Sequence, residues 1–355
     1  MQTLTFIIKK NEVNMKQLLF CLVLLISISL WSNDLQTAWV EADSLAKQGK
    51  YTEAAQVFID YLKNNDNADY QMELNYGIAC YYALAEETDL AFKYLAASID
   101  LGFSDLAWIQ KDTDLVNLHD HKTWKQLIDR MTANEQAKLA ALPDKRDSLL
   151  VISLPEPAKT SNVSVEQALW QRRSVRDYSE EALTLQEVSQ ILWSAYGITK
   201  VIAPQYLRGG LKTAPSAGAL YPLEVYLGAW NVSGLEPGFY YYQPNGHFLQ
   251  LVKRGNFSRE LTTVCYGQEF IFEAPASLIY SAIYERTTQK YGDRGRERYV
   301  PMDLGHSAEN VYLQAETLNL GTCAVGAFDD LKLRLLVPLP KAEEPLYVMP
   351  FGKKQ

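Results

Sequence analysis

Three arginines and a serine lie within five residues of the chain, at Arg172, Arg173, Ser174 and Arg176. Guanidinium groups form forked hydrogen bonds to phosphate oxygens, and a serine hydroxyl adds another donor. Each charge-assisted hydrogen bond of this kind contributes about 1.5–3 kcal/mol. The cluster therefore predicts an anion-binding site, and the alternative is a basic helix end that faces solvent.

Two segments rich in small residues, 213–227 and 321–328, are suited to contact with a flat ring because they present backbone rather than bulky side chains. The first contains Pro215, Ser216, Ala217 and Gly218, and the second contains Val325 and Gly326. The basic C-terminal end, which includes Lys353, would add charge to the anion site. A phosphate joined to a planar heterocycle is what flavin mononucleotide (FMN) presents. The alternative for the first segment is a turn that leads into a strand.

Capping and periodicity predict the elements that position these residues. Ser164 begins a helix that ends at the arginine cluster, and Thr184 caps an amphipathic helix over residues 185–193. Alternation and turn residues predict a hairpin over 239–251, and apolar runs predict strands over 276–283 and 346–349. We expect a charged loop over 293–298 and a long helix over 301–320.

Composition argues against several other classes of site. The net charge of −8 argues against a general nucleic-acid binder. The four cysteines are widely spaced and match neither a disulfide framework nor a metal site. His119 and His121 flank Asp120, a pattern more typical of a solvated turn than of a metal site. We therefore expect no metal.

Four segments are expected along the chain. Residues 1–32 combine Lys16 with an apolar run, which predicts a signal peptide or a retained anchor, and hence an exported (periplasmic) or membrane-anchored protein. Residues 33–135 repeat a helical pattern, as tetratricopeptide repeats (TPR) do, and 136–160 form a charged linker with a strand candidate at 149–154. Residues 161–355 carry the predicted sites. A cytoplasmic location is the alternative.

In their order along the second domain, the motifs resemble those of the FMN-dependent nitroreductase superfamily. The resemblance is strongest to its branch of SagB-type dehydrogenases, which form thiazoles and oxazoles from azolines. The matching stretches are residues 172–176, 215–222, 290–292, 305–310 and 321–330. The resemblance covers residues 162–354 and implies an α+β fold, with a mixed sheet wrapped by helices. An all-α TPR-like domain precedes it.

The resemblance also implies roles for individual residues. Arg172 and Ser174, with Arg173 beside them, would hold the phosphate and the ribityl chain. Arg176 would lie near the N1–C2 edge of the flavin, where a cation favours hydride acceptance. The other cofactor contacts implied are Pro215, Ser216, Ala217 and Gly218 along the ring, amides near Val325 and Gly326 at N5, and Lys353 at the phosphate.

Lys290 and Tyr291 match the Lys-Tyr pair of the dehydrogenase branch. They would assist deprotonation of a substrate carbon while hydride leaves to N5. The alternative is an ordinary lysine at a helix end next to a buried tyrosine.

The resemblance implies a homodimer, because family members are usually intertwined dimers with FMN at the subunit interface. It also implies a small-molecule or peptide substrate, and the TPR-like domain suggests a further protein partner. Azoline dehydrogenases act in the cytoplasm beside a cyclodehydratase and a docking protein, whereas this leader predicts export. An NAD(P)H-dependent nitro or quinone reductase stays open, as does a docking protein with an inactive flavin domain.

Overall fold

The computed structural model describes residues 33–65, 70–146, 150–202 and 207–355. The predicted leader, residues 1–32, lies outside the described residues. The chain divides into two compact units, Met1–Asn134 and Glu135–Gln355. Within the described ranges, no helix combines the length and the apolar character needed to cross a membrane.

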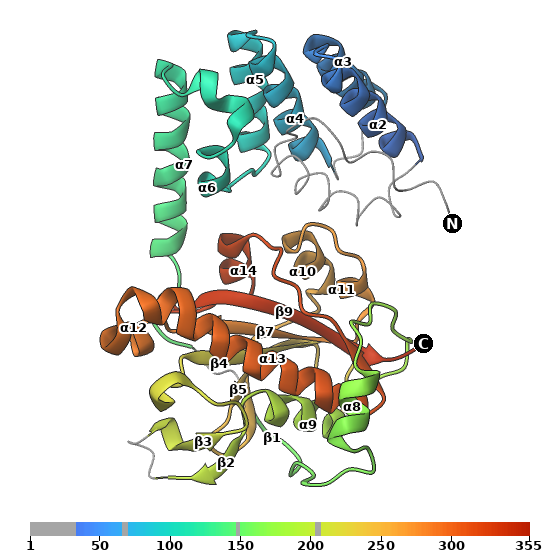
Figure 1. Ribbon diagram of the computed structural model, residues 1–355, viewed down its shortest axis with the longest axis vertical. Coiled ribbons are helices and arrows are strands. Elements are labelled where there is room, and N and C mark those ends of the chain that lie inside the picture. Colours follow the sequence, from blue (N-terminus) through green and yellow to red (C-terminus); the bar gives the residue numbers. More distant parts are fainter. Residues whose placement is uncertain (1–32, 66–69, 147–149, 203–206) are drawn as a thin grey trace. The chain divides into compact units, whose positions relative to one another are not determined.

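The first unit is helical (Figure 1). Its helices are α2 (Asn33–Lys47), α3 (Tyr51–Asn64), α4 (Gln71–Leu84), α5 (Thr88–Asp100), α6 (Leu106–Ile109) and a 3₁₀ helix (Thr113–Leu118), followed by α7 (Lys122–Ala140), whose last turns belong to the second unit. Helices α2 to α5 pack in sequence, each on the next. Ala55, Phe58 and Ala91 are fully buried between them. This packing suits small and aromatic residues at helix crossings, and the TPR assignment stays a prediction.

The second unit is built on a seven-stranded sheet with the order β1-β6-β5-β4-β7-β9-β8. The strands are β1 (Leu150–Ser153), β4 (Leu223–Ala229), β5 (Gly238–Gln243), β6 (Phe248–Arg254), β7 (Ala276–Ala282), β8 (Leu320–Thr322) and β9 (Glu344–Lys353), and a separate ribbon pairs β2 (Ile198–Val201) with β3 (Gly210–Lys212). The predicted α+β class is confirmed. Every described pairing in the large sheet is antiparallel, so the sheet is not mixed. The short connections of the β4–β5–β6 meander reverse the chain at each step, which explains part of this pattern.

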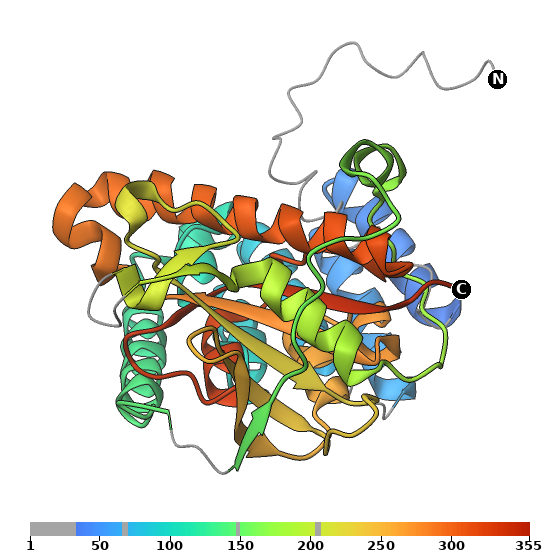
Figure 2. The ribbon, with the colours of Figure 1, turned by 90° about the horizontal axis from the view of Figure 1, so that it is seen from below.

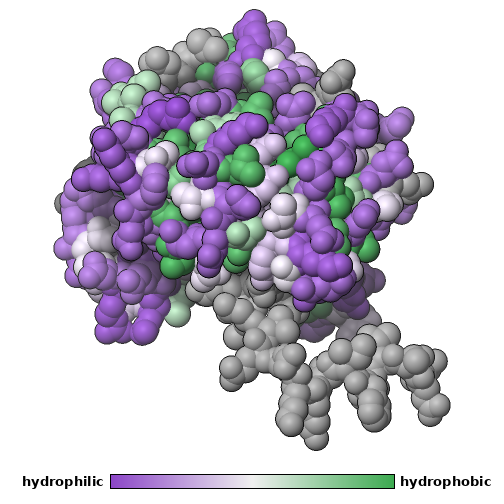
Figure 3. Space-filling view, turned by 90° about the horizontal axis from the view of Figure 1, so that it is seen from above, coloured by the Kyte–Doolittle hydropathy of each residue, from purple (hydrophilic) through white to green (hydrophobic). Residues whose placement is uncertain are grey.

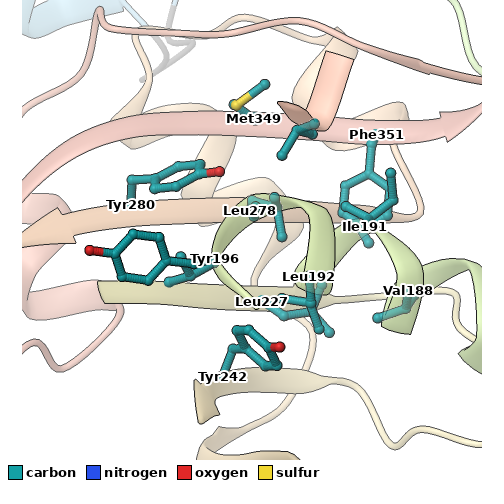
Figure 4. Close-up of a cluster of buried hydrophobic side chains, with 14 of the residues drawn as sticks. Val188, Ile191, Leu192, Tyr196, Leu227, Tyr242, Leu278, Tyr280, Met349 and Phe351 are labelled. Atoms are coloured by element: carbon teal, nitrogen blue, oxygen red, sulfur yellow. The ribbon is translucent and has the colours of Figure 1, made fainter. Parts of the chain in front are cut away.

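Helices cover both faces of this sheet (Figures 1 and 2). The helices of the second unit are α8 (Val165–Gln171), α9 (Leu185–Tyr196), α10 (Ser258–Val264), α11 (Phe270–Glu273), α12 (Glu285–Tyr291), α13 (Val300–Thr317) and α14 (Asp330–Leu336). Helices α9 and α13 pack on one face, and α10, α11 and α14 pack on the other. Figure 4 shows Val188, Ile191 and Leu192 of α9 directed at Leu227 and Leu278 of the sheet. The sheet therefore separates two apolar layers.

Local sequence signals account for many of the element boundaries. The Ser164 hydroxyl accepts from the Gln167 amide at 3.1 Å, and Thr184 with Glu187 forms a reciprocal capping box at the start of α9. The predicted hairpin is β5–β6, and the strand candidate in the expected linker is β1, which joins the sheet beside β6.

The prediction of a loop at residues 293–298 is wrong. Most of this segment belongs to a π-helical turn, Gly295–Tyr299, that continues into α13. Gly295 permits this close packing. A Cβ at this position would lie 3.0 Å from the carbonyl group of Thr287 on α12. A side chain there would push the turn away from that helix.

Candidate functional site

The arginine segment lies along the end of the sheet. The Val175 amide donates to the Thr322 carbonyl, and the Ser179 amide donates to the Lys353 carbonyl, both at 2.9 Å. The Tyr178 hydroxyl donates to the Pro350 carbonyl at 3.2 Å. These bonds hold the chain after α8 against β8 and β9, so the arginines and Lys353 share one end of the sheet.

Tyr312 of α13 joins this segment to the second small-residue loop. Its hydroxyl lies 3.3 Å from the Ser174 hydroxyl and accepts from the Ala324 amide at 2.7 Å. The guanidinium carbon of Arg172 lies 5.3 Å from the centroid of its ring. The sequence predicts Tyr312 only as part of the helix over 301–320, because a helical period does not reveal a hydroxyl shared by two distant segments.

The guanidinium groups of the cluster keep donors free. Within the described residues, no carboxylate pairs with Arg172, Arg173 or Arg176; Arg173 donates instead to two nearby carbonyls. Lys353 is already paired with Glu181, which raises the pKa of the lysine. An open depression of about 370 Å³ adjoins the segment and is lined by Trp170, Gln171, Arg173, Glu316, Asn319 and Lys354. The Arg173 guanidinium at this depression suits an anion, although the lining also holds Glu316, which pairs with Lys354 at 2.6 Å. Lys353 would have to exchange its partner.

The first small-residue loop is attached to the other part of α13. The Ser216 hydroxyl donates to Asp303 at 2.5 Å, and the Ala217 amide donates to the other oxygen of that carboxylate at 3.1 Å. The Tyr221 amide donates to the Ser216 hydroxyl at 2.9 Å. Asp303 is buried, and its burial raises its pKa. Asp303 was not predicted, because the contact joins residues 87 positions apart.

Gly218 brings this loop to the Lys-Tyr pair of α12. It is exposed and has a φ of +63°, which favours glycine. A Cβ on Gly218 would lie 2.7 Å from the Tyr291 hydroxyl and 3.2 Å from the Lys290 ammonium. The Lys290 ammonium lies 5.2 Å from the centroid of the Tyr291 ring. Three predicted residues from two segments therefore meet at one point.

The second small-residue loop fits its predicted role in part. The Val325 amide donates to the Val348 carbonyl at 2.8 Å, so it is not available to a flavin. Gly326 is exposed, and its amide has no partner in the part of the chain that the structure describes. Of the two predicted amides, only that of Gly326 can face a ligand. Cys323 beside them is buried, and its burial raises the pKa of its thiol.

The predicted residues form two groups on opposite flanks of α13. Asp303 holds the group with Pro215, Ser216, Ala217, Gly218, Lys290 and Tyr291, and Tyr312 joins Arg172, Ser174 and the 321–328 loop, with Arg173, Arg176 and Lys353 on the same side. Nine residues separate Asp303 from Tyr312. Nine residues are two and a half helical turns and about 13.5 Å, so the two side chains leave the helix in opposite directions. Figure 1 shows α12 near one end of α13 and α8 near the other.

The comparisons with known proteins concern the second unit. Residues 169–353, just over half of the chain, match the model of the nitroreductase family. A candidate nitroreductase of Methanocaldococcus jannaschii is 45% identical over 203 residues, which cover 57% of this chain and 96% of that protein. The trifolitoxin-processing protein TfxB of Rhizobium leguminosarum bv. trifolii is 29% identical over 117 residues, which cover 31% of this chain and 30% of that protein.

Solved structures similar to this chain include two candidate nitroreductases. The crystal structure of a candidate nitroreductase from Ralstonia eutropha is 29% identical, with a TM-score of 0.50, and the match covers 60% of this chain and 94% of that one. One from Anabaena variabilis is 33% identical with a TM-score of 0.50, and the match covers 58% of this chain and 42% of that one.

Proposed function

Because the chain belongs to the nitroreductase family, we propose that it is an FMN-dependent oxidoreductase and most like the azoline dehydrogenases that form thiazoles and oxazoles. The observation that carries the proposal is the meeting of Lys290 and Tyr291 with the Gly218 loop. A simple flavin reductase takes hydride from a nicotinamide and needs no base at the substrate carbon. A proton acceptor beside the ring is what a dehydrogenase of a C–H bond requires.

The residues present fit FMN. Arg172, Arg173 and Ser174 would hold its phosphate and ribityl chain, since neither guanidinium pairs with a carboxylate among the described residues and the depression beside them is open. Arg176 would lie at the N1–C2 edge, and the Gly326 amide would face N5. Members of this family generally bind FMN, and bound FMN supplies a hydride acceptor.

Lys290 and Tyr291 would act on the substrate proton. Aromatisation of an azoline removes one hydride and one proton and leaves a new double bond in the ring. The exposed Lys290 ammonium, once deprotonated, or the half-buried Tyr291 hydroxyl beside it can accept or relay that proton. The Gly218 backbone passes close to both groups, and no side chain at this position stands between them and the ring.

We further propose a homodimer in which a second copy completes the site. The phosphate residues lie on one flank of α13 together with Arg176 and Gly326, and the 215–218 loop lies on the other flank with Lys290 and Tyr291, so a single chain presents two half-sites. In a two-fold dimer, each half-site of one copy can meet the other half-site of its partner. The 180° separation of Asp303 and Tyr312 around the helix supports this arrangement.

A peptide substrate is supported by the relative named as trifolitoxin-processing. The helical unit would then hold the peptide or a partner protein. Figure 3 shows a face on which hydrophobic residues lie in small groups among hydrophilic ones.

A second candidate is an NAD(P)H-dependent reductase of nitro compounds or quinones. It is favoured by the Methanocaldococcus jannaschii relative, which is more similar in sequence than TfxB and is named as a candidate nitroreductase. The two functions differ in the need for Lys290 and Tyr291. A reductase takes its proton from solvent and should tolerate their loss.

Turnover assays of the FMN-loaded protein separate the two functions. We expect oxidation of a synthetic peptide thiazoline with consumption of oxygen and without NAD(P)H. Lys290→Ala and Tyr291→Phe should each lower kcat by about 10²–10⁴-fold, the usual contribution of a general base. Lys111→Ala, an exposed lysine of the helical unit, is the matched control. Steady NAD(P)H turnover with a nitroaromatic, undiminished in both variants, would replace the dehydrogenase with the reductase.

A further inference from the structure

Arg286 ties the helix of the Lys-Tyr pair to the loop that the pair contacts. It lies one turn before Lys290 on α12, and its side chain is only 15% exposed. One nitrogen of its guanidinium donates to the Tyr221 carbonyl at 3.1 Å, and another pairs closely with Glu224 of β4. Tyr221 closes the small-residue loop, so Arg286 spans α12, the loop and the sheet.

The loop depends on such anchors because its backbone is unusual. Gly218, Ala219 and Tyr221 all have positive φ, at +63°, +53° and +50°. Conformations of this kind cost free energy in non-glycine residues and persist only where surrounding contacts hold them. Helix α12 has seven residues, too few to be stable by itself, so its position also depends on tertiary contacts.

Glu224 also binds a second arginine, which comes from the segment after α7. Arg146 lies 3.6 Å from the Glu224 carboxylate, pairs closely with Glu343 and donates to the Tyr226 hydroxyl at 2.6 Å. Its guanidinium carbon lies 3.7 Å from the centroid of the Tyr241 ring. Glu224 is thus a buried carboxylate held between two guanidinium groups, one from α12 and one from the segment before β1.

We propose that Arg286 is a positioning residue for Lys290 and Tyr291, and that Arg146 sets its position through Glu224. The segment that follows the helical unit would then influence catalysis without touching the substrate. Without Arg146, the attraction of Glu224 to a second cation is lost, and the carboxylate moves toward Arg286 or toward water. Either movement changes the attachment of α12.

The inference rests on the proposed function for its catalytic part, and amide hydrogen exchange tests its structural part without any flavin. The variants are Arg146→Gln, Arg286→Gln and Arg286→Lys, all in the full chain. Arg259→Gln is the matched control, because Arg259 also pairs with a carboxylate but is exposed on α10. We expect faster exchange in residues 285–292 in Arg146→Gln, although Arg146 has no contact with α12 among the described residues. Exchange in α12 equal to that of wild type would overturn the inference.

The catalytic part is tested on FMN-loaded protein with the same peptide thiazoline. We expect Arg286→Gln to lower kcat by about 10²-fold, the scale of a misplacement of about 1 Å, with KM and flavin content little changed. Arg286→Lys should recover part of the rate, and Arg146→Gln should alter the pH profile of kcat that the Lys-Tyr pair sets.

If Arg286→Gln folds poorly, Arg286→Lys and Arg146→Gln still provide the test. A loss confined to KM, or kinetics of Arg146→Gln equal to those of Arg259→Gln, would contradict the inference. If the wild type is inactive but exchange is faster in Arg146→Gln, the proposed function is rejected and the connection from Arg146 through Glu224 to α12 is retained.

Discussion

Glu343 is a buried carboxylate, 1% exposed, at the centre of the charge network of the second unit. It accepts from the Ser281 hydroxyl at 2.7 Å and the Tyr226 hydroxyl at 2.8 Å, and it pairs with Arg146. Burial raises its pKa to about 7; the charge of nearby Glu224 acts in the same direction, and Arg146 opposes both. Its ionisation is therefore coupled to folding.

The sign of this coupling gives a pH prediction. The folded pKa lies above the ordinary value of 4.5, so the folded state holds the proton more tightly than the unfolded state. The resulting stability is fully present below pH 4.5 and is lost as the pH rises through 7. The loss is about 3 kcal/mol, since each unit of pKa corresponds to about 1.4 kcal/mol. Denaturant unfolding at pH 5 and pH 8 should show it in wild type and not in Glu343→Gln. Parallel profiles of the two proteins would show that Glu343 is ionised throughout.

Residue-scale prediction from sequence works where chemistry is concentrated in a short stretch. The arginine cluster and the glycine of the first loop were visible because their types and spacing are unusual. Tyr312, Asp303 and Arg286 were not, since each acts through contacts with segments far away in the chain. The Val325 amide was predicted to face the flavin, but it donates to the Val348 carbonyl instead. This bond depends on tertiary pairing, which the sequence of the loop alone does not reveal.

Helix α13 is the element on which both proposed half-sites depend. Its inner face packs on the sheet, and its two flanks carry the Asp303 and Tyr312 anchors. The periodicity of the sequence predicted the helix and its buried face. It did not predict the anchors, because a flank position can carry either a solvated or a bonded polar group. Capping signals located the starts of α8 and α9, and the mistaken loop at 293–298 arose because charged residues there form an exposed helical turn.

The position of the two half-sites on opposite flanks of α13 leads to a prediction about mixtures of two variants. Arg172→Ala damages the phosphate half-site, and Gly218→Val damages the ring half-site by placing a side chain against the Tyr291 hydroxyl. Each variant alone should be inactive. After mixing and subunit exchange, half of the dimers are mixed and each has one intact site, so roughly a quarter of the wild-type activity should return.

A mixture of Arg172→Ala with Ser174→Ala is the matched control, because both changes affect the same half-site and no intact site can form. The flavin content of the mixtures gives a second measure that needs no substrate. An absence of recovery in the first mixture, with exchange verified by mass spectrometry, would place the whole site in one chain.

At the scale of the whole molecule, the chain joins a helical unit to a nitroreductase-family unit. The family match begins at residue 169 and does not extend over the helical unit. Export through residues 1–32 stays a prediction. An exported form would need a route for its FMN, since FMN is made inside the cell. The charge network around Glu224 gives the segment after α7 a physical connection to α12 within the second unit.

The visible absorbance spectrum of the purified protein, before and after addition of FMN, tests whether the chain is a flavoprotein. We predict a flavin spectrum with stoichiometric FMN released on denaturation. Arg172→Ala should lose it, and Arg130→Ala, which changes an exposed arginine of the helical unit, should retain it. A colourless protein that takes up no added FMN would contradict the enzyme assignment. A flavin spectrum of full intensity in Arg172→Ala would contradict the phosphate site.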